Sequence, residues 1–232
     1  MKIAAMTWMQ VEHYLLEDDR CVLPLGSTEQ HAYLSLAVDA ILSERVAVDA
    51  AEPLGIPVFP VVAYGLTPYF MAYPGTVTLT PDTYARLLGE VLSSIAHHGF
   101  RRIVIVNGHG GNREGRPAAL AWASEQAGVT LRWHDWWAGQ QTMDAVRAVD
   151  RDASHASWME GFPWTRVPGV EIPAGHKASV DLVDRDDLSP ADLRARLGDG
   201  CFGGFYQRPD DELTKVWSVA VEETRSLLVE GW

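Results

Sequence analysis

Cysteine is scarce in this sequence. The 232 residues contain two, Cys21 and Cys201, which lie far apart and have neither a CxxC nor a zinc-ribbon spacing. A disulfide framework and a structural zinc site built from thiolates are therefore both disfavoured. We expect two reduced thiols in the core.

Long apolar runs and an excess of positive charge are missing as well. No hydrophobic stretch approaches the length of a membrane span, and the first residues lack the charged-then-apolar pattern of a signal peptide. Lysine and arginine number 19 against 31 acidic residues, which gives a formal net charge of -12. This sign argues against nucleic acid and against an anionic membrane surface as partners. We expect a cytoplasmic protein that binds neither.

Several familiar catalytic motifs are also absent. Without a G-x-S-x-G elbow, a metal-free serine hydrolase has no obvious nucleophile. Neither GxGxxG nor a P-loop lysine accompanies the glycine-rich stretch 107–112, which weakens the interpretation of that stretch as a phosphate cradle.

The composition that remains is ordinary for a globular domain, with 47% hydrophobic and 22% charged residues. Apolar strand-like runs alternate with helical patterns. We expect strands within 21–27, 56–65, 101–112 and 129–137, and helices over 38–51, 80–98, 116–127, from 189 and over 210–230. The prolines of 56–65 favour an edge or irregular strand. Thr80, followed by proline, is expected to cap its helix.

This alternation predicts one α/β domain over residues 1–232, with a parallel or mixed central sheet and helices on both faces. Ile103 to Val106 form the clearest strand, because four consecutive apolar residues suit a strand buried on both faces. Between about 138 and 180 the pattern weakens, and we expect a loop-rich cap over the site. Tryptophans concentrate around this cap, so one or two of them are expected to face the substrate.

Candidate metal ligands occur where strands pass into loops, and in the cap. They are Glu29, His31, Asp39, His109 and Glu160, with His155 as one further histidine. Imidazoles and carboxylates in such number suit two divalent cations that together activate a water. Taken singly, Glu29 and His31 are better explained as hydrogen-bonded loop residues, and Asp39 is compatible with an acid in the first turn of a helix. His109 is stronger, because it follows the central strand between glycines that allow a tight turn.

Four motifs in this order resemble the creatininase family of amidohydrolases. They are LPLGSTEQH (23–31) with a downstream aspartate, YPGTVTL (73–79), NGHGGN (107–112) and HASWME (155–160). The combination is specific, and the resemblance runs from about residue 20 to 180. It implies a creatininase-type α/β fold, often assembled as hexamers, and a site for two metal ions, with Zn first and Mn or Fe as alternatives.

The resemblance also implies a role for each candidate. Glu29, Asp39 and His109 would bind one metal; His31, the bridging Asp39 and Glu160 would bind the other. Glu160 is assigned because Gly111 stands where creatininase has an acid, two residues after the motif histidine. His155 would be the acid/base residue, and Glu160 is counted with it as catalytic. The loop after His31 is one residue shorter than in relatives.

The function implied is hydrolysis of a non-peptide C–N bond in a small cyclic or linear amide by a metal-activated water. A peptidase or formamide deformylase of the same family, acting in cofactor maturation, is the alternative. A non-catalytic, metal-free assembly protein is a third hypothesis. The partners expected are a small amide and further copies of the chain.

Overall fold

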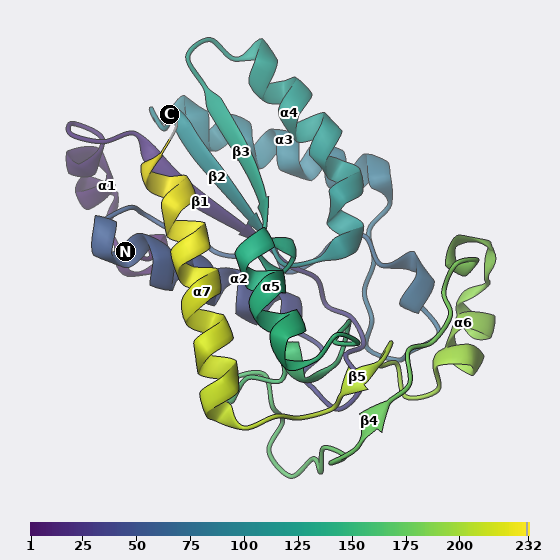
Figure 1. Ribbon diagram of the computed structural model, residues 1–232. Coiled ribbons are helices and arrows are strands. Elements are labelled where there is room, and N and C mark those ends of the chain that lie inside the picture. Colours follow the sequence, from purple (N-terminus) through teal and green to yellow (C-terminus); the bar gives the residue numbers. More distant parts are fainter. Residues whose placement is uncertain (231) are drawn as a thin grey trace.

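Three parallel strands form the centre of the fold, which is described by a computed structural model over residues 1–230 and 232 (Figure 1). They are β1 (Arg20–Leu25), β2 (Arg102–Asn107) and β3 (Thr130–Asp135), in the order β1-β2-β3. The register places Leu25 opposite Asn107, and Asn107 opposite Asp135. The carboxyl ends of all three strands therefore meet at one edge of the sheet.

The strands are apolar throughout because both faces of the sheet are covered. Val104 and Val106 of β2 pack into one core cluster, whereas Ile103 and Ile105 pack into the other. This alternation is the two-residue period of a strand. The face with Val104 and Val106 is covered by α2 (Val38–Ala51), α5 (Gln140–Val149) and α7 (Asp210–Val229). The face with Ile103 and Ile105 is covered by α3 (Pro81–His97) and α4 (Arg116–Glu125). The expected α/β architecture is confirmed.

The remaining α-helices and strands are α1 (Trp8–Tyr14), α6 (Pro190–Leu197) and the antiparallel pair β4 (His176–Lys177) and β5 (Gly204–Phe205). Of these, α1, β4 and β5 were not predicted, because they are too short to carry a periodic signal. The helix expected from residue 189 begins at Pro190, and the Thr80 side chain caps α3 by accepting from the Thr83 amide.

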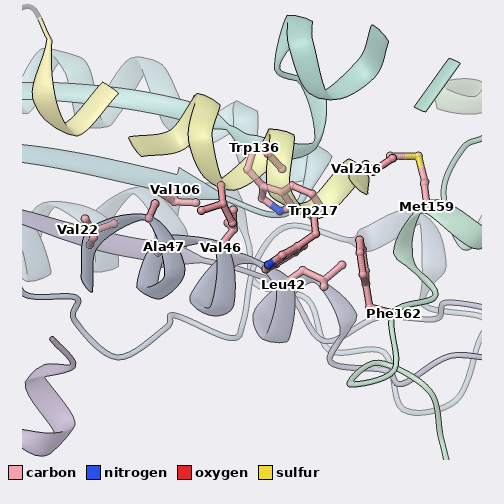
Figure 2. Packing of buried hydrophobic residues seen from close by; sticks show 14 of the residues in the cluster. Val22, Leu42, Val46, Ala47, Val106, Trp136, Met159, Phe162, Val216 and Trp217 are labelled. Carbon is pink, nitrogen blue, oxygen red and sulfur yellow. The ribbon is translucent and has the colours of Figure 1, made fainter. Parts of the chain in front are cut away.

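Aromatic side chains join the cap to the helical layer (Figure 2). The ring of Trp217, from α7, lies 5.8 Å from Trp136 and 5.0 Å from Phe162 between centroids. Phe162 is buried and stacks on Trp164 at 5.2 Å. The segment after Glu160 is thus inserted into the core, which fixes the backbone that carries this carboxylate.

Two predicted segments differ from the structure. Residues 56–65 make only isolated bridges to β1, through Val58 and Val62, because proline removes ladder donors from this edge. Residues 140–149, expected as part of the loop-rich cap, are the helix α5, so that part of the prediction was wrong. Five of the ten α5 residues are apolar, and Met143, Val146 and Val149 pack into the core together with residues of α7.

The two cysteines are free and buried, as expected. Within residues 1–230 and 232, no helix combines the length and apolar character needed to cross a bilayer.

Candidate metal centre

The loops after β1 and β2 meet because their strands end side by side. Glu29 and His31 follow β1, His109 follows β2, and Asp39 lies in the first turn of α2. Ligands in open α/β sheets commonly bind at such carboxyl ends. His155 and Glu160 approach from the irregular segment that follows α5. The structure therefore brings all six candidate residues together.

One group consists of Glu29, Asp39 and His109, all buried. The His109 Nδ1 atom lies 3.0 Å from Asp39 Oδ2 and 3.3 Å from Glu29 Oε1. On the other side of the ring, His109 Nε2 donates to the Leu66 carbonyl oxygen at 2.9 Å. In the neutral ring the Nδ1 lone pair therefore points at two carboxylates.

A second group consists of His31, Asp39 and Glu160. His31 Nε2 lies 3.2 Å from Asp39 Oδ1 and 3.8 Å from Glu160 Oε2. His31 Nδ1 donates to the Glu29 carbonyl oxygen at 3.2 Å, which leaves Nε2 without its proton in the neutral ring. Asp39 belongs to both groups and offers a different oxygen to each histidine.

The polar atoms of this cluster fit divalent cations. His31 Nε2 and Glu29 Oε2 are buried and have no hydrogen-bond partner within the described part of the chain. Leaving such groups unsatisfied is costly, and a cation between the imidazole nitrogens and the carboxylate oxygens removes the cost. Backbone carbonyls already orient both rings, as is usual for metal-binding histidines. Mixed nitrogen and oxygen donors suit Zn, Mn and Fe.

When no cation is bound, protons on the buried side chains neutralise part of the negative charge of the carboxylates. Burial lowers the pKa of His31, but Asp39, Glu160 and Glu29 outweigh burial and raise it to about 10. The pKa of Asp39 is held well below its usual range by the two histidines, despite its burial. Burial raises the pKa of Glu160 to about 7. The cluster thus has excess negative charge to neutralise.

His155 differs from the other two histidines. Burial, together with the charge on His31, lowers its pKa well below the ordinary value. Its ring stacks on Phe70 at 5.0 Å, and its Nε2 atom lies 2.9 Å from the side-chain nitrogen of Gln30. The Nδ1 atom is turned toward the cluster, 3.8 Å from Glu29 Oε1. His155 also forms a ligand-like group with Glu29 and His31.

Two alanines beside the site have left-handed backbones, with φ of 48° at Ala32 and 60° at Ala156. This conformation strains a residue with a Cβ atom, and such strain concentrates at functional sites. The backbone amide of each alanine donates a hydrogen bond to a side chain of the site. Ala32 N–H donates to Gln30 Oε1 at 3.1 Å, and Ala156 N–H donates to Glu160 Oε2 at 2.6 Å.

Gly111 explains why the acid of the second group comes from elsewhere. A Cβ atom at this position would lie 1.9 Å from the Leu66 carbonyl oxygen and 2.6 Å from His109 Nε2. The hydrogen bond that orients His109 therefore occupies the space of any side chain at residue 111. Glu160, from the segment that follows α5, stands in the second group instead.

The cluster lies in the wall of a cavity of about 330 Å³. Beyond the cluster, its lining includes Tyr69, Phe70, Trp137, Met143, Met159, Arg185 and Phe202. Trp137 faces the cavity, whereas Trp136 and Trp158 are buried in the core. Tyr69, Arg185 and Phe202 were not predicted, because they come from short irregular segments whose sequence gives no sign that they lie close together.

The creatininase family model, described as creatinine amidohydrolase, matches residues 4–161. The chain is similar to a creatinine amidohydrolase of Pseudomonas putida, with 32% identity over 46% of this chain and 44% of that protein. It is similar to a 3-dehydro-scyllo-inosose hydrolase of Thermotoga maritima, with 33% identity over 45% and 34%. It is also similar to a mycofactocin precursor peptide peptidase of Mycobacterium tuberculosis, with 34% identity over 75% and 60%. The chain thus spans less than two thirds of the length of these relatives.

Solved structures share the fold over nearly the whole chain. A crystal structure of creatinine amidohydrolase superposes with a TM-score of 0.78 and 21% identity, covering 98% of this chain and 96% of the other. A manganese form of creatininase gives a TM-score of 0.76 at 20% identity with the same coverage. At such identities the likeness concerns the fold.

Proposed function

Because the chain belongs to the creatininase family, we propose that it is a hydrolase that uses two divalent cations to cleave a C–N bond of a small amide. One observation carries the proposal: two ligand groups share the buried Asp39 in the wall of a cavity of about 330 Å³. That volume is at the lower end of the range for small-molecule sites, roughly 300 to 1,000 Å³. Zn is the first choice of metal, and Mn or Fe are alternatives.

Each ligand group would hold one cation. Glu29 and His109 would complete the first site, and His31 and Glu160 the second, with Asp39 between them. When bound, such a pair polarises a carbonyl and lowers the pKa of a water toward neutrality. Hydrogen bonds behind the candidate ligands hold these side chains in place. Leu66 orients His109, and Ser27 donates to Asp39 Oδ2 at 2.8 Å.

His155 would move the proton to the leaving nitrogen. Its lowered pKa keeps the ring neutral at neutral pH, so it can accept a proton and pass it on. Gln30 contacts Nε2, which leaves Nδ1 to face the cluster. A general acid or base of this kind contributes about 10²- to 10⁴-fold to the rate.

A peptidase acting in cofactor maturation is the second candidate. It is supported by the mycobacterial relative, which matches 75% of this chain under the name of a precursor peptide peptidase. The same cation pair would serve, since a peptide bond is an amide. A panel of cyclic amides, formamides and short peptides separates the candidates. A homo-oligomer, hexameric by resemblance, and a cytoplasmic location stay predictions.

Elemental mass spectrometry of gently purified protein is expected to find about two equivalents of Zn, Mn or Fe. The His109→Ala variant should lose at least one of them, because it removes the nitrogen that faces Glu29 and Asp39. His134→Ala is the matched control, since this buried histidine contacts Thr224 instead. A wild-type protein that neither carries metal nor takes it up on reconstitution would overturn the proposed function.

Metal affinity is expected to rise with pH. The metal-free chain keeps a proton on His31 through neutral pH, because the surrounding carboxylates outweigh burial and raise its pKa to about 10. A cation must displace this proton, so the apparent Kd should fall about tenfold per pH unit for each proton released, between about pH 6 and about pH 8. Competition against a chelating dye measures the trend. A Kd that stays constant over this range contradicts it.

A further inference from the structure

One wall of the cavity belongs to a small lobe with its own apolar cluster. This cluster contains Phe70, Tyr73, Leu193 and Leu197, with Leu182 and Leu188 packed against it. The lobe includes α6 and the loop before it (Figure 1). That loop presents Arg185 to the cavity.

The backbone of Arg185 is held by the same lobe. Its amide donates to the Leu182 carbonyl oxygen at 3.1 Å, and its carbonyl oxygen accepts from the Leu188 amide at 3.2 Å. Both leucines pack against the apolar cluster, so the loop is anchored on either side of the arginine. The position of the side chain at the cavity wall therefore follows from the packing of the lobe.

Tyr69 connects Arg185 to the metal centre. The Arg185 guanidinium carbon lies 5.1 Å from the centre of the Tyr69 ring, and that centre lies 6.4 Å from the His109 ring centre. The Tyr69 hydroxyl is 3.4 Å from His109 Nε2. The Arg185 guanidinium carbon is thus no farther from the centre of the His109 ring than the sum of these two distances. A small amide can bridge such a span.

The charges of the site favour an anionic substrate. Glu29, Asp39 and Glu160 supply the carboxylates of the two ligand groups. Two divalent cations would carry one positive charge more than these three groups neutralise, and a metal-bound hydroxide would offset it. Among the described residues that line the cavity, Arg185 is the only lysine or arginine, so it would supply the net positive charge. A positive cavity in a chain with a net charge of -12 attracts anions locally.

We propose that Arg185 makes the site selective for small amides that carry a carboxylate on the side of the molecule away from the scissile C–N bond. This inference rests on the proposed function, because the amide itself is placed by the cation pair. Arginine matches a carboxylate with parallel N–H donors. It has enough donors to hold a carboxylate beside another partner.

Binding of hydroxamates tests the inference without relying on turnover. One series of aliphatic hydroxamates ends in a carboxylate, from the succinyl to the suberyl member, and the matched series ends in a carboxamide. The hydroxamate group addresses the metals, and the tail addresses Arg185. Calorimetry gives the Kd of each compound for the metal-loaded wild type and for the Arg185→Gln and Arg194→Gln variants. Arg194 is the control: it belongs to the same lobe but contacts Ala72 and Tyr73 instead of the cavity.

The best carboxylate-tailed compound should bind about tenfold or more tightly than its carboxamide partner. This preference should disappear in Arg185→Gln and persist in Arg194→Gln, while carboxamide-tailed compounds bind all three proteins alike. Equal binding of both series to the wild type, or a preference that survives in Arg185→Gln, would overturn the carboxylate inference alone. If no hydroxamate binds and the protein holds no metal, the proposed function fails as well.

Discussion

Replacing Asp39 by asparagine is expected to remove both cations together and to lower turnover by about 10³-fold or more. The reason is geometric: Asp39 Oδ1 faces His31 and Oδ2 faces His109, so one carboxylate belongs to both ligand groups. Losing the Lewis-acid pair costs several kcal/mol of transition-state stabilisation, and each 1.4 kcal/mol or so is about tenfold in rate. Asparagine keeps the size of the side chain and removes its charge, which isolates the electrostatic contribution.

The measurement is the metal content of the variant, taken together with its rate on whichever amide the wild type cleaves. Asp49→Asn is the matched control, because Asp49 lies on the same helix and accepts a hydrogen bond from Trp217 outside the cluster. Two equivalents of metal and a wild-type rate in Asp39→Asn would refute the bridging assignment. Loss of a single equivalent would place Asp39 in one site only.

Truncating Phe162 to alanine should lower the free energy of unfolding by about 3 to 5 kcal/mol, the usual cost of emptying a buried aromatic site. Phe162 is 1% exposed and stacks on the Trp164 ring. It also contacts the Trp217 ring (Figure 2). Since it follows Glu160 by two residues, its loss also releases the loop that carries this ligand. The variant should therefore bind the second cation more weakly than the first.

Urea denaturation of chelator-treated protein measures this effect, because removing metal separates packing from metal binding. Phe162→Leu retains most of the volume and should cost less than about 1.5 kcal/mol. Val183→Ala, at a site 96% exposed, should change stability by no more than about 0.5 kcal/mol. A loss below about 1 kcal/mol in Phe162→Ala would show that this ring does not anchor the cap.

The central sheet was predictable because its signal is local. Ile103 to Val106 are apolar without interruption, and only a strand covered on both faces needs such a run. Thr80 and the proline after it likewise mark the start of α3 within a few residues. In contrast, α5 is short and follows Gly139, which supplies no side-chain cap, so no start signal accompanies its apolar residues.

For the site, the residues of the ligand groups were predictable from the sequence, but the wall of the cavity was not. The four motifs indicated the family correctly, and the structure places Glu29, His31, Asp39, His109, His155 and Glu160 together. That these residues bind metal and catalyse a reaction stays a prediction. The cavity wall could not be foreseen, since Tyr69 and Arg185 lie more than a hundred residues apart and meet only through the packing of the lobe.

The two ligand groups differ in where their members originate. Every donor of the first group comes from segments next to the sheet edge, whereas the second needs Glu160 from the segment anchored by Phe162. Displacing that segment would leave one donor set complete and the other short of a ligand. If the two groups bind metal, we therefore expect the first to need only the segments at the sheet edge, and the second to need the docked cap as well.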